Sequence, residues 1–521
     1  STDLPTSIIH WLLVLALALS WSTGMRIAAS DDRANFAWLE PLLLQGAVEH
    51  WHFVSALVLL MLACVYGVVL RERPQMGPLA PWHVLRQGPP ASRRWALNRL
   101  LCWLGIALLL AAGVSGALMF YAPGWLPEPA LARVHHWLAW GFPVFLAVHV
   151  AGQWLLGGFR QILKILLPHW AHGRSVLMGC SLAALIGFGA WGLDRGLIGE
   201  LHLVRVATSP LLDGQPDDPI WRSAKPVQVQ TLRGANLAGG ESLVRVRGVQ
   251  DGQYAYLLFE WEDPTRDQRF MPLQKTADGW RLMQTGFLQQ DENTYYEDKF
   301  AVMLSRSSRI GGDSIHLGPH PLKDRPGSLN GRGLHYTAEG QRVDVWHWKG
   351  TRTSLLQQMD DNHFGPPLPG PDTADQRYTG GYAADPKLGG GFEENWFFVE
   401  GDRNYVRPRR IPIGPVPEGD VPFVMNVLDT LLYDPAQDNY PVGTIIPSIL
   451  TSTAMRGDRG DVAGVATWKD GWWRLEARRR LDTGSPYDLP IASGIFFWVG
   501  VFDHSQIRHT RHWRPLRLAA D

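Results

Sequence analysis

The spacing of apolar residues divides the chain into two parts. Up to residue 193, long apolar runs occur at approximately 7–27, 50–70, 100–120, 134–156 and 175–193. Each run is long enough to cross roughly 30 Å of hydrocarbon as a helix. We therefore expect five transmembrane helices. The fourth contains Pro143, which is expected to kink the helix within a bundle that can accommodate it.

After residue 193 the apolar positions recur with a period of two. The segments "SLVRVRGVQ" and "QYAYLLFEWED" alternate on either side of the turn "DGQ", and "WWRLEARRRL" behaves likewise. Such alternation is typical of strands with one buried face. We predict an α + β multidomain protein, with a transmembrane bundle at 1–193, a linker at 194–221 and a β-sandwich at 222–521.

The fourth apolar run, "VHHWLAWGFPVFLAVHVAGQWLLGG", contains three histidines but no Asp, Glu, Lys or Arg. In a helix, 14 residues turn the chain by about 1400°, about 40° short of whole turns, and rise about 21 Å. His135 and His149 therefore share one helix face at two depths. His136 lies 13 residues before His149 and faces nearly the opposite way.

The charges of the connecting loops predict the orientation. The loops at 71–99 and 157–174 are rich in Arg and Lys, and the other loops are not. By the positive-inside rule the two basic loops are cytoplasmic. We expect a multi-pass protein of the inner membrane, with a cytoplasmic N-terminus and a periplasmic C-terminal domain.

With this orientation, each histidine of the fourth helix has a partner at its own depth. His10 lies at the cytoplasmic level with His149, and His50 or His52 lies at the outer level with His135. Neutral imidazoles are common ligands of haem iron, so we predict two bis-histidine haems that carry electrons across the bilayer. His50 and His52 differ by about 200° around the helix, so only one can face the haem.

Composition narrows the range of functions. The formal net charge is +0, which gives no indication of nucleic-acid binding. The three cysteines, Cys64, Cys102 and Cys180, all lie in apolar runs. The second part of the chain therefore has no disulfide, no thiolate metal site and no C-x-x-C-H motif for covalent haem.

The first apolar run, "TSIIHWLLVLALALSWSTGMRI", resembles the first helix of bacterial di-haem cytochromes b, the membrane subunits of hydrogenases and formate dehydrogenases. In that family the fourth helix supplies two histidines 14 residues apart, which matches His135 and His149. The resemblance covers about residues 1–190. It implies haem b and a quinone site close to one haem.

The second part of the chain resembles the haem-binding domain of the ethylbenzene dehydrogenase gamma-subunit family. The segments that carry this resemblance are "LFEWEDPTRD", "DVWHWKGTR" and "FFWVGVFDHSQIRHTRHW". It implies a β-sandwich with one non-covalent haem b, held in the family by a methionine and a lysine. Here His316 stands at the methionine position, and His509 or His512 at the lysine position. In an extended segment these two point to opposite faces, so only one can face the haem.

Acidic motifs in the second part have a simpler interpretation. The clusters in "WEDPTRD" and "MDDN" could bind calcium, although capped turns are favoured. "RGDRGD" at 456–461 is interpreted as a polar turn in which Asp461 fixes the loop.

We predict a membrane-bound, multi-haem b-type cytochrome that transfers electrons between the quinone pool and a periplasmic redox partner. The partner would be a c-type cytochrome or a molybdenum enzyme. Whether the chain itself oxidises quinol or reduces quinone stays open. One alternative is an accessory subunit that docks onto a larger respiratory complex, and another is a periplasmic ligand-binding module.

Overall fold

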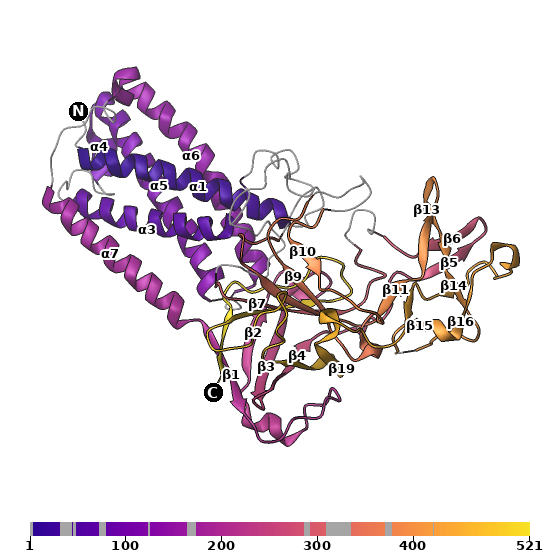
Figure 1. Ribbon diagram of the computed structural model, residues 1–521. Helices are drawn as coiled ribbons and strands as arrows, with labels where there is room; N and C mark the ends of the chain where they lie inside the picture. The colour runs from indigo at the N-terminus through magenta and orange to yellow at the C-terminus, as the bar shows by residue number, and fades with distance from the viewer. Residues whose placement is uncertain are drawn as a thin grey trace. The chain divides into compact units, whose positions relative to one another are not determined.

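The computed structural model describes residues 4–31, 44, 48–71, 80–122, 126–163, 173–285, 292–308, 335–369, 378–419 and 421–520. The chain forms two compact units, Ser1–Leu197 and Ile198–Asp521 (Figure 1). Over the described residues, the first unit is helical, and the second is built from strands and short 3₁₀ turns. The predicted division into a helical and a β-rich part is confirmed.

The helices of the first unit are α1 (Leu4–Asp31), α3 (Val48–Arg71), α4 (Ala80–Gln87), α5 (Pro90–Tyr121), α6 (Glu128–Leu163) and α7 (Gly173–Gly196). Five of them contain segments long and apolar enough to span a membrane: Thr6–Ala28, Val48–Val68, Ser92–Tyr121, Ala130–Arg160 and Leu177–Asp194. These correspond to the five predicted spans. The short helix α4 lies between the second and third spans in the chain.

The helices pack in neighbouring pairs, with α1 against α3, α3 against α7, and α5 against α6. Large apolar side chains cover their outer surfaces. Trp137, Leu155 and Phe188 are 73%, 74% and 72% exposed, respectively. Side chains of this kind are stable on a helix surface that faces lipid. Near its end, α6 departs from helical geometry at Gly157 and Gly158.

The second unit contains twenty-two strands among the described residues. They are β1 (Gly199–Arg205), β2 (Val227–Thr231), β3 (Ser242–Gln250), β4 (Tyr254–Glu262), β5 (Leu273–Thr276), β6 (Gly279–Leu282), β7 (Lys299–Ser305), β8 (Val343–Lys349), β9 (Asp360–Phe364), β10 (Tyr382–Ala384), β11 (Phe392–Glu394), β12 (Trp396–Val399), β13 (Asp402–Pro408), β14 (Arg410–Pro412), β15 (Met425–Asn426), β16 (Thr430–Leu432), β17 (Ile445–Ile446), β18 (Ile449–Thr451), β19 (Ala463–Lys469), β20 (Trp472–Arg480), β21 (Phe496–Phe502) and β22 (Leu516–Ala520).

Two hairpins show how local sequence specifies these strands. The predicted alternation around "DGQ" gives β3 and β4, which pair in antiparallel register from Val244 opposite Trp261 to Gln250 opposite Ala255. Strands β19 and β20 meet at Asp470 and Gly471, which have φ angles of 55° and 77°. An Asp-Gly pair with two positive φ angles is a favoured hairpin turn.

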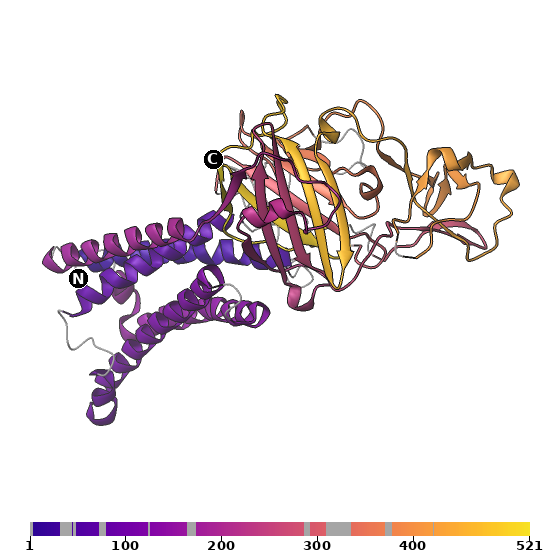
Figure 2. The same cartoon turned by 90° about the horizontal axis from the view of Figure 1, so that it is seen from below.

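One large sheet organises the unit, in the order β10-β9-β8-β7-β21-β22-β1-β3-β4-β20-β19, with β2 paired to β3. Strand β1 runs parallel to both β22 and β3 and joins the two halves of the sheet. The sheet curls, and its ends approach where Gln358 bridges Ala463 (Figure 2). The expected sandwich of two sheets is therefore hydrogen-bonded into one continuous sheet, because β1 fills the position between the halves.

The position of β1 also changes the expected linker. We predicted a tether at 194–221, but Gly199–Arg205 form a strand of the large sheet. Leu201 and Leu203 on this strand are fully buried. A strand that buries two leucines between two neighbours is part of the core, and the boundary between the units lies near Leu197.

Tryptophan and phenylalanine fill the inside of the curled sheet. Trp261 stacks on Phe300 and Trp473, with ring centroids 4.5 and 6.1 Å apart, and Trp348 packs against Trp473 at 4.7 Å. Aromatic side chains bury large apolar areas and stabilise such a core strongly. A second, smaller core lies around Trp280, where β5, β6, β12, β13 and β17 form a five-stranded sheet.

Candidate haem-binding site

Two histidine pairs lie across the helices of the first unit. His10 of α1 faces His149 of α6, with ring centroids 6.5 Å apart and ring planes 34° apart. His52 of α3 faces His135 of α6, with centroids 6.2 Å apart and ring planes 88° apart. One helix thus supplies one member of each pair, and two different helices supply the other members.

Hydrogen bonds orient the rings of the second pair. Nδ1 of His52 lies 2.9 Å from the carbonyl oxygen of Ser20, to which it donates. Nδ1 of His135 lies 2.9 Å from Oγ of Ser115, whose hydroxyl in turn donates to the Ala112 carbonyl oxygen at 3.0 Å. A proton held at Nδ1 leaves the lone pair on Nε2 for a metal.

The first pair has a different environment. Nδ1 of His149 is buried and has no hydrogen-bond partner among the residues that the structure describes. The ring of Phe145 stacks on His149, with centroids 5.5 Å apart and planes 25° apart. Aromatic packing, rather than a hydrogen bond, therefore holds this imidazole in position.

Glycines allow the backbone to approach the rings of the second pair. A Cβ added at Gly24 of α1 would lie 3.0 Å from Cε1 of His52. A Cβ added at Gly116 of α5 would lie 3.2 Å from Cε1 of His135. Both distances are shorter than ordinary contacts between carbon atoms. Glycine at these positions gives the two imidazoles room inside the bundle.

The spacing within each pair fits a metal bound between two imidazoles. Metal–nitrogen bonds of about 2 Å on opposite sides of one ion place the ring centroids about 6 Å apart. His10 with His149 and His52 with His135 would each hold the iron of one haem b. Haem supplies reversible one-electron transfer when bound. The chain contributes the ligands, their orientation and an apolar surrounding.

The structure brings together His52, rather than His50, and His135. His50 precedes this pair on α3, and its ring lies 5.7 Å from that of Trp51. His136 accepts a hydrogen bond from Nε1 of Trp140 at 3.0 Å. It thus has a partner on its own helix and lies outside the two pairs, as its spacing predicts.

In the β-rich unit, His512 has no nitrogen available for a metal. Its Nε2 accepts a hydrogen bond from the Val499 backbone N–H at 3.0 Å, and its Nδ1 donates to the Arg514 carbonyl oxygen at 2.6 Å. Burial lowers its pKa to about 4, so the ring stays neutral. We expected His512 as an alternative haem ligand, and these two bonds contradict that assignment.

His509 differs from His512. Its Nδ1 donates to the Thr510 carbonyl oxygen at 2.7 Å, and no described residue bonds to its Nε2. Burial lowers the pKa of His509 to about 4. A neutral ring with its proton on Nδ1 presents the Nε2 lone pair that a metal requires. His316, the expected partner, lies outside the described residues.

A second imidazole, that of His347 on β8, lies near His509 and is not among the predicted haem ligands. Both rings lie against Phe502, with centroids 6.4 and 4.9 Å from it. In the sheet, His347 is paired with Ala301, and Ala301 with Gly500, which touches His509. Ala301 and Gly500 are both small, so the row of the sheet between these histidines carries a single methyl group.

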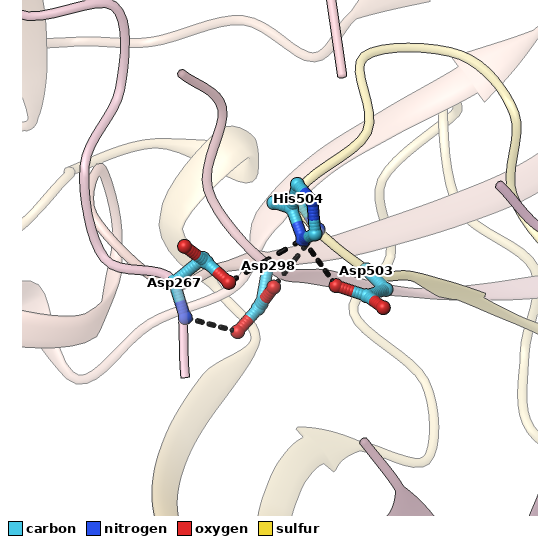
Figure 3. A group of neighbouring side chains, drawn as sticks. All are labelled: Asp267, Asp298, Asp503 and His504. Atoms are coloured by element: carbon cyan, nitrogen blue, oxygen red, sulfur yellow. Dashed lines mark hydrogen bonds and ion pairs between the residues drawn. The ribbon is translucent and has the colours of Figure 1, made fainter. Parts of the chain in front are cut away.

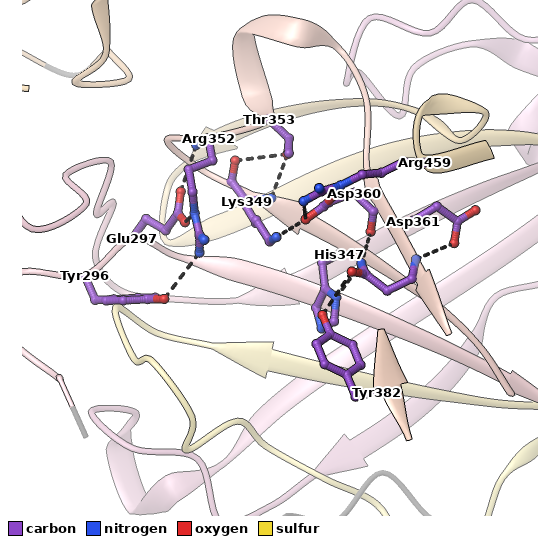
Figure 4. Close-up of polar contacts among 11 residues, drawn as sticks. Tyr296, Glu297, His347, Lys349, Arg352, Thr353, Asp360, Asp361, Tyr382 and Arg459 are labelled. Carbon is purple, nitrogen blue, oxygen red and sulfur yellow. Dashed lines mark hydrogen bonds and ion pairs between the residues drawn. The ribbon is translucent and has the colours of Figure 1, made fainter. Parts of the chain in front are cut away.

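A charged network lies near His347 (Figure 4). Lys349 and Arg459 both bind the buried carboxylate of Asp360, Arg459 through Nε at 2.5 Å. Arg352 binds Glu297 at 2.5 Å. Burial lowers the pKa of Lys349 to about 8. Each cation of this network is bonded to a carboxylate of the protein, so the network is best explained as support for β8 and β9.

Comparison with protein families adds to this geometry. Residues 1–167 match the family described as prokaryotic cytochrome b561, and residues 218–514 match the family described as ethylbenzene dehydrogenase. The second match covers more than half of the chain. Both resemblances noted in the sequence are confirmed. The curated proteins contain no match.

Similar solved structures are distant. A family 9 carbohydrate binding module from Caldicellulosiruptor kristjanssonii, in complex with glucose, is 11% identical, with a TM-score of 0.24, covering 62% of this chain and 96% of that chain. A putative carbohydrate-binding protein from Bacteroides uniformis is 7% identical, with a TM-score of 0.26, covering 62% of this chain and 100% of that one. We base no conclusion on similarity at this level.

Five helices able to span a membrane, two facing histidine pairs and the two family matches agree with one another. The chain belongs to the ethylbenzene dehydrogenase family through its C-terminal domain and carries an N-terminal membrane domain of the prokaryotic cytochrome b561 family.

Proposed function

We propose that this protein is a membrane-bound b-type cytochrome that transfers electrons between the quinone pool and a redox partner on the outer side of the membrane. The observation that carries the proposal is the pair of imidazole distances, 6.5 Å for His10 and His149 and 6.2 Å for His52 and His135. The membership of residues 1–167 in a cytochrome b561 family supports electron transfer as the activity.

Each pair would hold one haem b at its own depth. Along α6 the two ligand levels are 14 residues apart, which corresponds to about 21 Å of helix. Such a separation places one ligand pair toward each side of the bilayer. The role of the chain is to fix the four imidazoles in helices that do not rearrange, so that electron transfer requires little reorganisation.

A third haem in the β-rich unit is part of the proposal. His509, with Nε2 not engaged by any described residue, would supply one ligand, and His316 the other. The match of residues 218–514 to the ethylbenzene dehydrogenase family supports a haem in this unit. We leave His512 out of the proposed ligand set, because both of its ring nitrogens are hydrogen-bonded to the protein.

The proposed orientation follows from the loop charges, and the proposed partners are those that this orientation makes accessible. Basic residues at 71–99 and 157–174 favour a cytoplasmic position for these loops and a periplasmic one for the β-rich unit. A quinone in the lipid phase would exchange electrons with one membrane haem. A c-type cytochrome or a molybdenum enzyme would exchange them with the haem of the β-rich unit.

Haem stoichiometry and redox titration of the full chain in detergent test the proposal. We expect three b-type haems that a quinol reduces. The two ring planes are 34° apart in the pair of His10 and His149 and 88° apart in the pair of His52 and His135. Because the angle differs between the pairs, the two ferric haems are expected to give distinct electron paramagnetic resonance spectra. A chain that binds haem but is not reduced by quinol would favour an accessory subunit of a larger complex.

A chain without haem in the helical unit would contradict the proposal as a whole. Orientation is tested separately, by protease access to the β-rich unit in spheroplasts and in inverted vesicles. We expect cleavage only in spheroplasts, because the unit would then face the medium. Cleavage only in inverted vesicles would reverse the proposed direction of the chain.

A further inference from the structure

Five aspartates gather at one end of the large sheet. They come from segments that are far apart in the sequence: Asp344 of β8, Asp361 of β9, Asp385 after β10, Asp461 before β19 and Asp488 before β21. Strands β8, β9 and β10 are neighbours in the sheet, and the bridge between Gln358 and Ala463 brings the start of β19 beside them. The curling of the sheet therefore assembles the cluster.

Three of these carboxylates are close enough to share one ligand. Asp344, Asp361 and Asp488 each offer an oxygen atom within 4.8 Å of the oxygens offered by the others. Asp344 and Asp361 are fully buried, and Asp488 is 7% exposed. Carboxylates at this distance repel one another strongly when water is excluded.

One oxygen of each carboxylate is held by the protein, and the other has no partner. Asp344 Oδ2 accepts from Arg479 and from the Leu489 N–H, and Asp361 Oδ1 accepts from the Asn362 N–H at 2.9 Å. Asp488 Oδ2 accepts from the Thr483 hydroxyl at 2.5 Å. The opposite oxygens of all three are buried without a hydrogen-bond partner among the described residues.

The two remaining aspartates extend the same pattern. Asp385 binds His363 through Oδ1 at 2.5 Å, and its Oδ2 is buried without a described partner. Oδ1 of Asp461 is likewise buried and unpartnered within the described chain. Unsatisfied buried oxygens are rare in folded proteins, and here five of them occur in one cluster.

A second acidic cluster, made of Asp267, Asp298, Asp503 and His504, contains its own cation (Figure 3). There, Nδ1 of His504 binds Asp503 and lies 3.3 Å from Asp267. Asp298 accepts from the backbone N–H groups of His504 and Asp267 at 2.9 and 2.7 Å. The imidazolium of His504 supplies the positive charge, so this cluster is interpreted as a structural ion pair.

In the cluster around Asp361, the ion pair described for the three facing carboxylates joins Arg479 to Asp344. Arg479 also donates to the Leu489 carbonyl oxygen, and His363 is bonded to Asp385. The unpartnered oxygens of Asp361 and Asp488 therefore have no bonded cation among the described residues.

We propose that Asp344, Asp361 and Asp488 bind one calcium ion, with Asp461 and Asp385 completing its surroundings. Calcium–oxygen distances of about 2.3–2.6 Å allow ligand oxygens of one ion to lie up to about 5 Å apart, which fits the cluster. Calcium takes six to eight oxygen ligands in flexible geometry, whereas magnesium requires near-ideal octahedral geometry and is usually bound through one or two carboxylates.

Bound calcium would link β8, β9 and the segment before β21, and would stabilise the closed form of the sheet. The site does not depend on haem. In this proposal Asp361 of "MDDN" and Asp461, the last aspartate of "RGDRGD", belong to one cation site, although they are 100 residues apart in the chain.

Thermal unfolding of the full chain in detergent, stripped with EDTA and titrated with CaCl₂ or MgCl₂, tests the proposal. We expect calcium to raise the unfolding midpoint of the β-rich unit and to be retained after desalting, with a weaker response to magnesium. In Asp361→Asn and Asp488→Asn the half-saturating calcium concentration is expected to rise at least about tenfold. Asp267→Asn, in the cluster that contains His504, is the control and is expected to keep the calcium response.

Two results would overturn the site. The first is an unchanged unfolding midpoint of the wild-type chain with calcium, together with no calcium retained. The second is an Asp361→Asn variant that is more stable than the wild type and insensitive to calcium, which shows that the aspartates share protons instead of a metal ion. An equal response to magnesium would contradict the assignment to calcium.

Discussion

Histidines of the helical unit and of the β-rich unit differ in what surrounds their ring nitrogens. In the helices, His52 and His135 are bonded through Nδ1 and face each other across 6.2 Å. In the β-rich unit, both nitrogens of His512 are bonded to the protein. A metal ligand is therefore recognised by a nitrogen that is oriented and still available, and not by the presence or burial of a histidine.

The largest expected effect is the loss of a membrane haem. His135→Ala and His149→Ala each remove one ligand of a different pair, so each variant is expected to lose a different haem entirely. Spectra of pyridine haemochromes, with redox titration, give the count and identify the haem that remains. His136→Ala is the matched control, because Nε2 of His136 accepts a hydrogen bond from Trp140 of the same helix and His136 is not a member of either facing pair. Loss of a haem in His136→Ala would contradict the pairing.

The two C-terminal histidines are expected to differ in the same way. His509→Ala should remove the haem of the β-rich unit and leave the two membrane haems. His512→Ala should keep the haem count but destabilise the unit by about 1–3 kcal/mol, because a buried N–H and a buried carbonyl lose their partners. Haem analysis and thermal unfolding separate the two results. If His512→Ala loses haem while remaining folded, the assignments are reversed.

A smaller effect is expected from the hydrogen bond between Ser115 and His135. The bond favours the oxidised haem by increasing electron density on the imidazole. Ser115→Ala is expected to raise the midpoint potential of that haem by on the order of 40 mV, equivalent to about 1 kcal/mol. Ser181→Ala is the control, since this hydroxyl bonds to its own helix at the Leu177 carbonyl oxygen. A potential that moves equally in both variants would argue against a specific effect.

The smallest expected effect concerns pH and the cluster around His504. Burial lowers the pKa of His504. The hydrogen bonds and negative charges of Asp267 and Asp503 outweigh this effect and raise the pKa to about 10. Its stabilisation is therefore complete below about pH 6.5 and is lost as the pH rises through about 10. Burial and the charge of Asp503 raise the pKa of Asp263 to about 8, so its contribution to stability is also lost as the pH rises. Burial and the charge of Asp263 likewise raise the pKa of Asp298.

His504→Gln is expected to weaken this pH dependence. Thermal midpoints of the full chain between pH 7 and pH 10 should fall less in the variant than in the wild type. Arg247 and Glu260 form an ion pair elsewhere in the sheet, and Glu260→Gln serves as a control that keeps the wild-type slope. Identical slopes in His504→Gln and wild type would show that the imidazolium does not stabilise the cluster.

Much of the helical unit is predictable from sequence because its determinants are local. The spans follow from the length of the apolar runs, and the common face of His135 and His149 follows from the period of the helix. The pairing of His10 with His149 needs only the alternating direction of successive spans. The choice between His50 and His52 depends on the rotation of α3 against its neighbours, which no local pattern specifies.

The β-rich unit is less predictable because its sites are built from distant segments. The hairpin at Asp251 could be identified from alternation and a turn, but the insertion of β1 between β22 and β3 could not. The bond from Val499 to His512 likewise depends on how the chain returns to β21. Sequence similarity suggested two alternative ligands at the end of the chain, and only the contacts distinguish them.

The sequence alone determined the five spans, the two depths of histidine and the β-rich character of the second part, because these depend on periodicity and on transfer of apolar residues from water. Tertiary structure decided that His52 faces His135, that His512 is already bonded, and that five aspartates from 344 to 488 meet at one end of the sheet. These outcomes depend on the packing of residues far apart in the chain, where each group's partners are set by the fold as a whole.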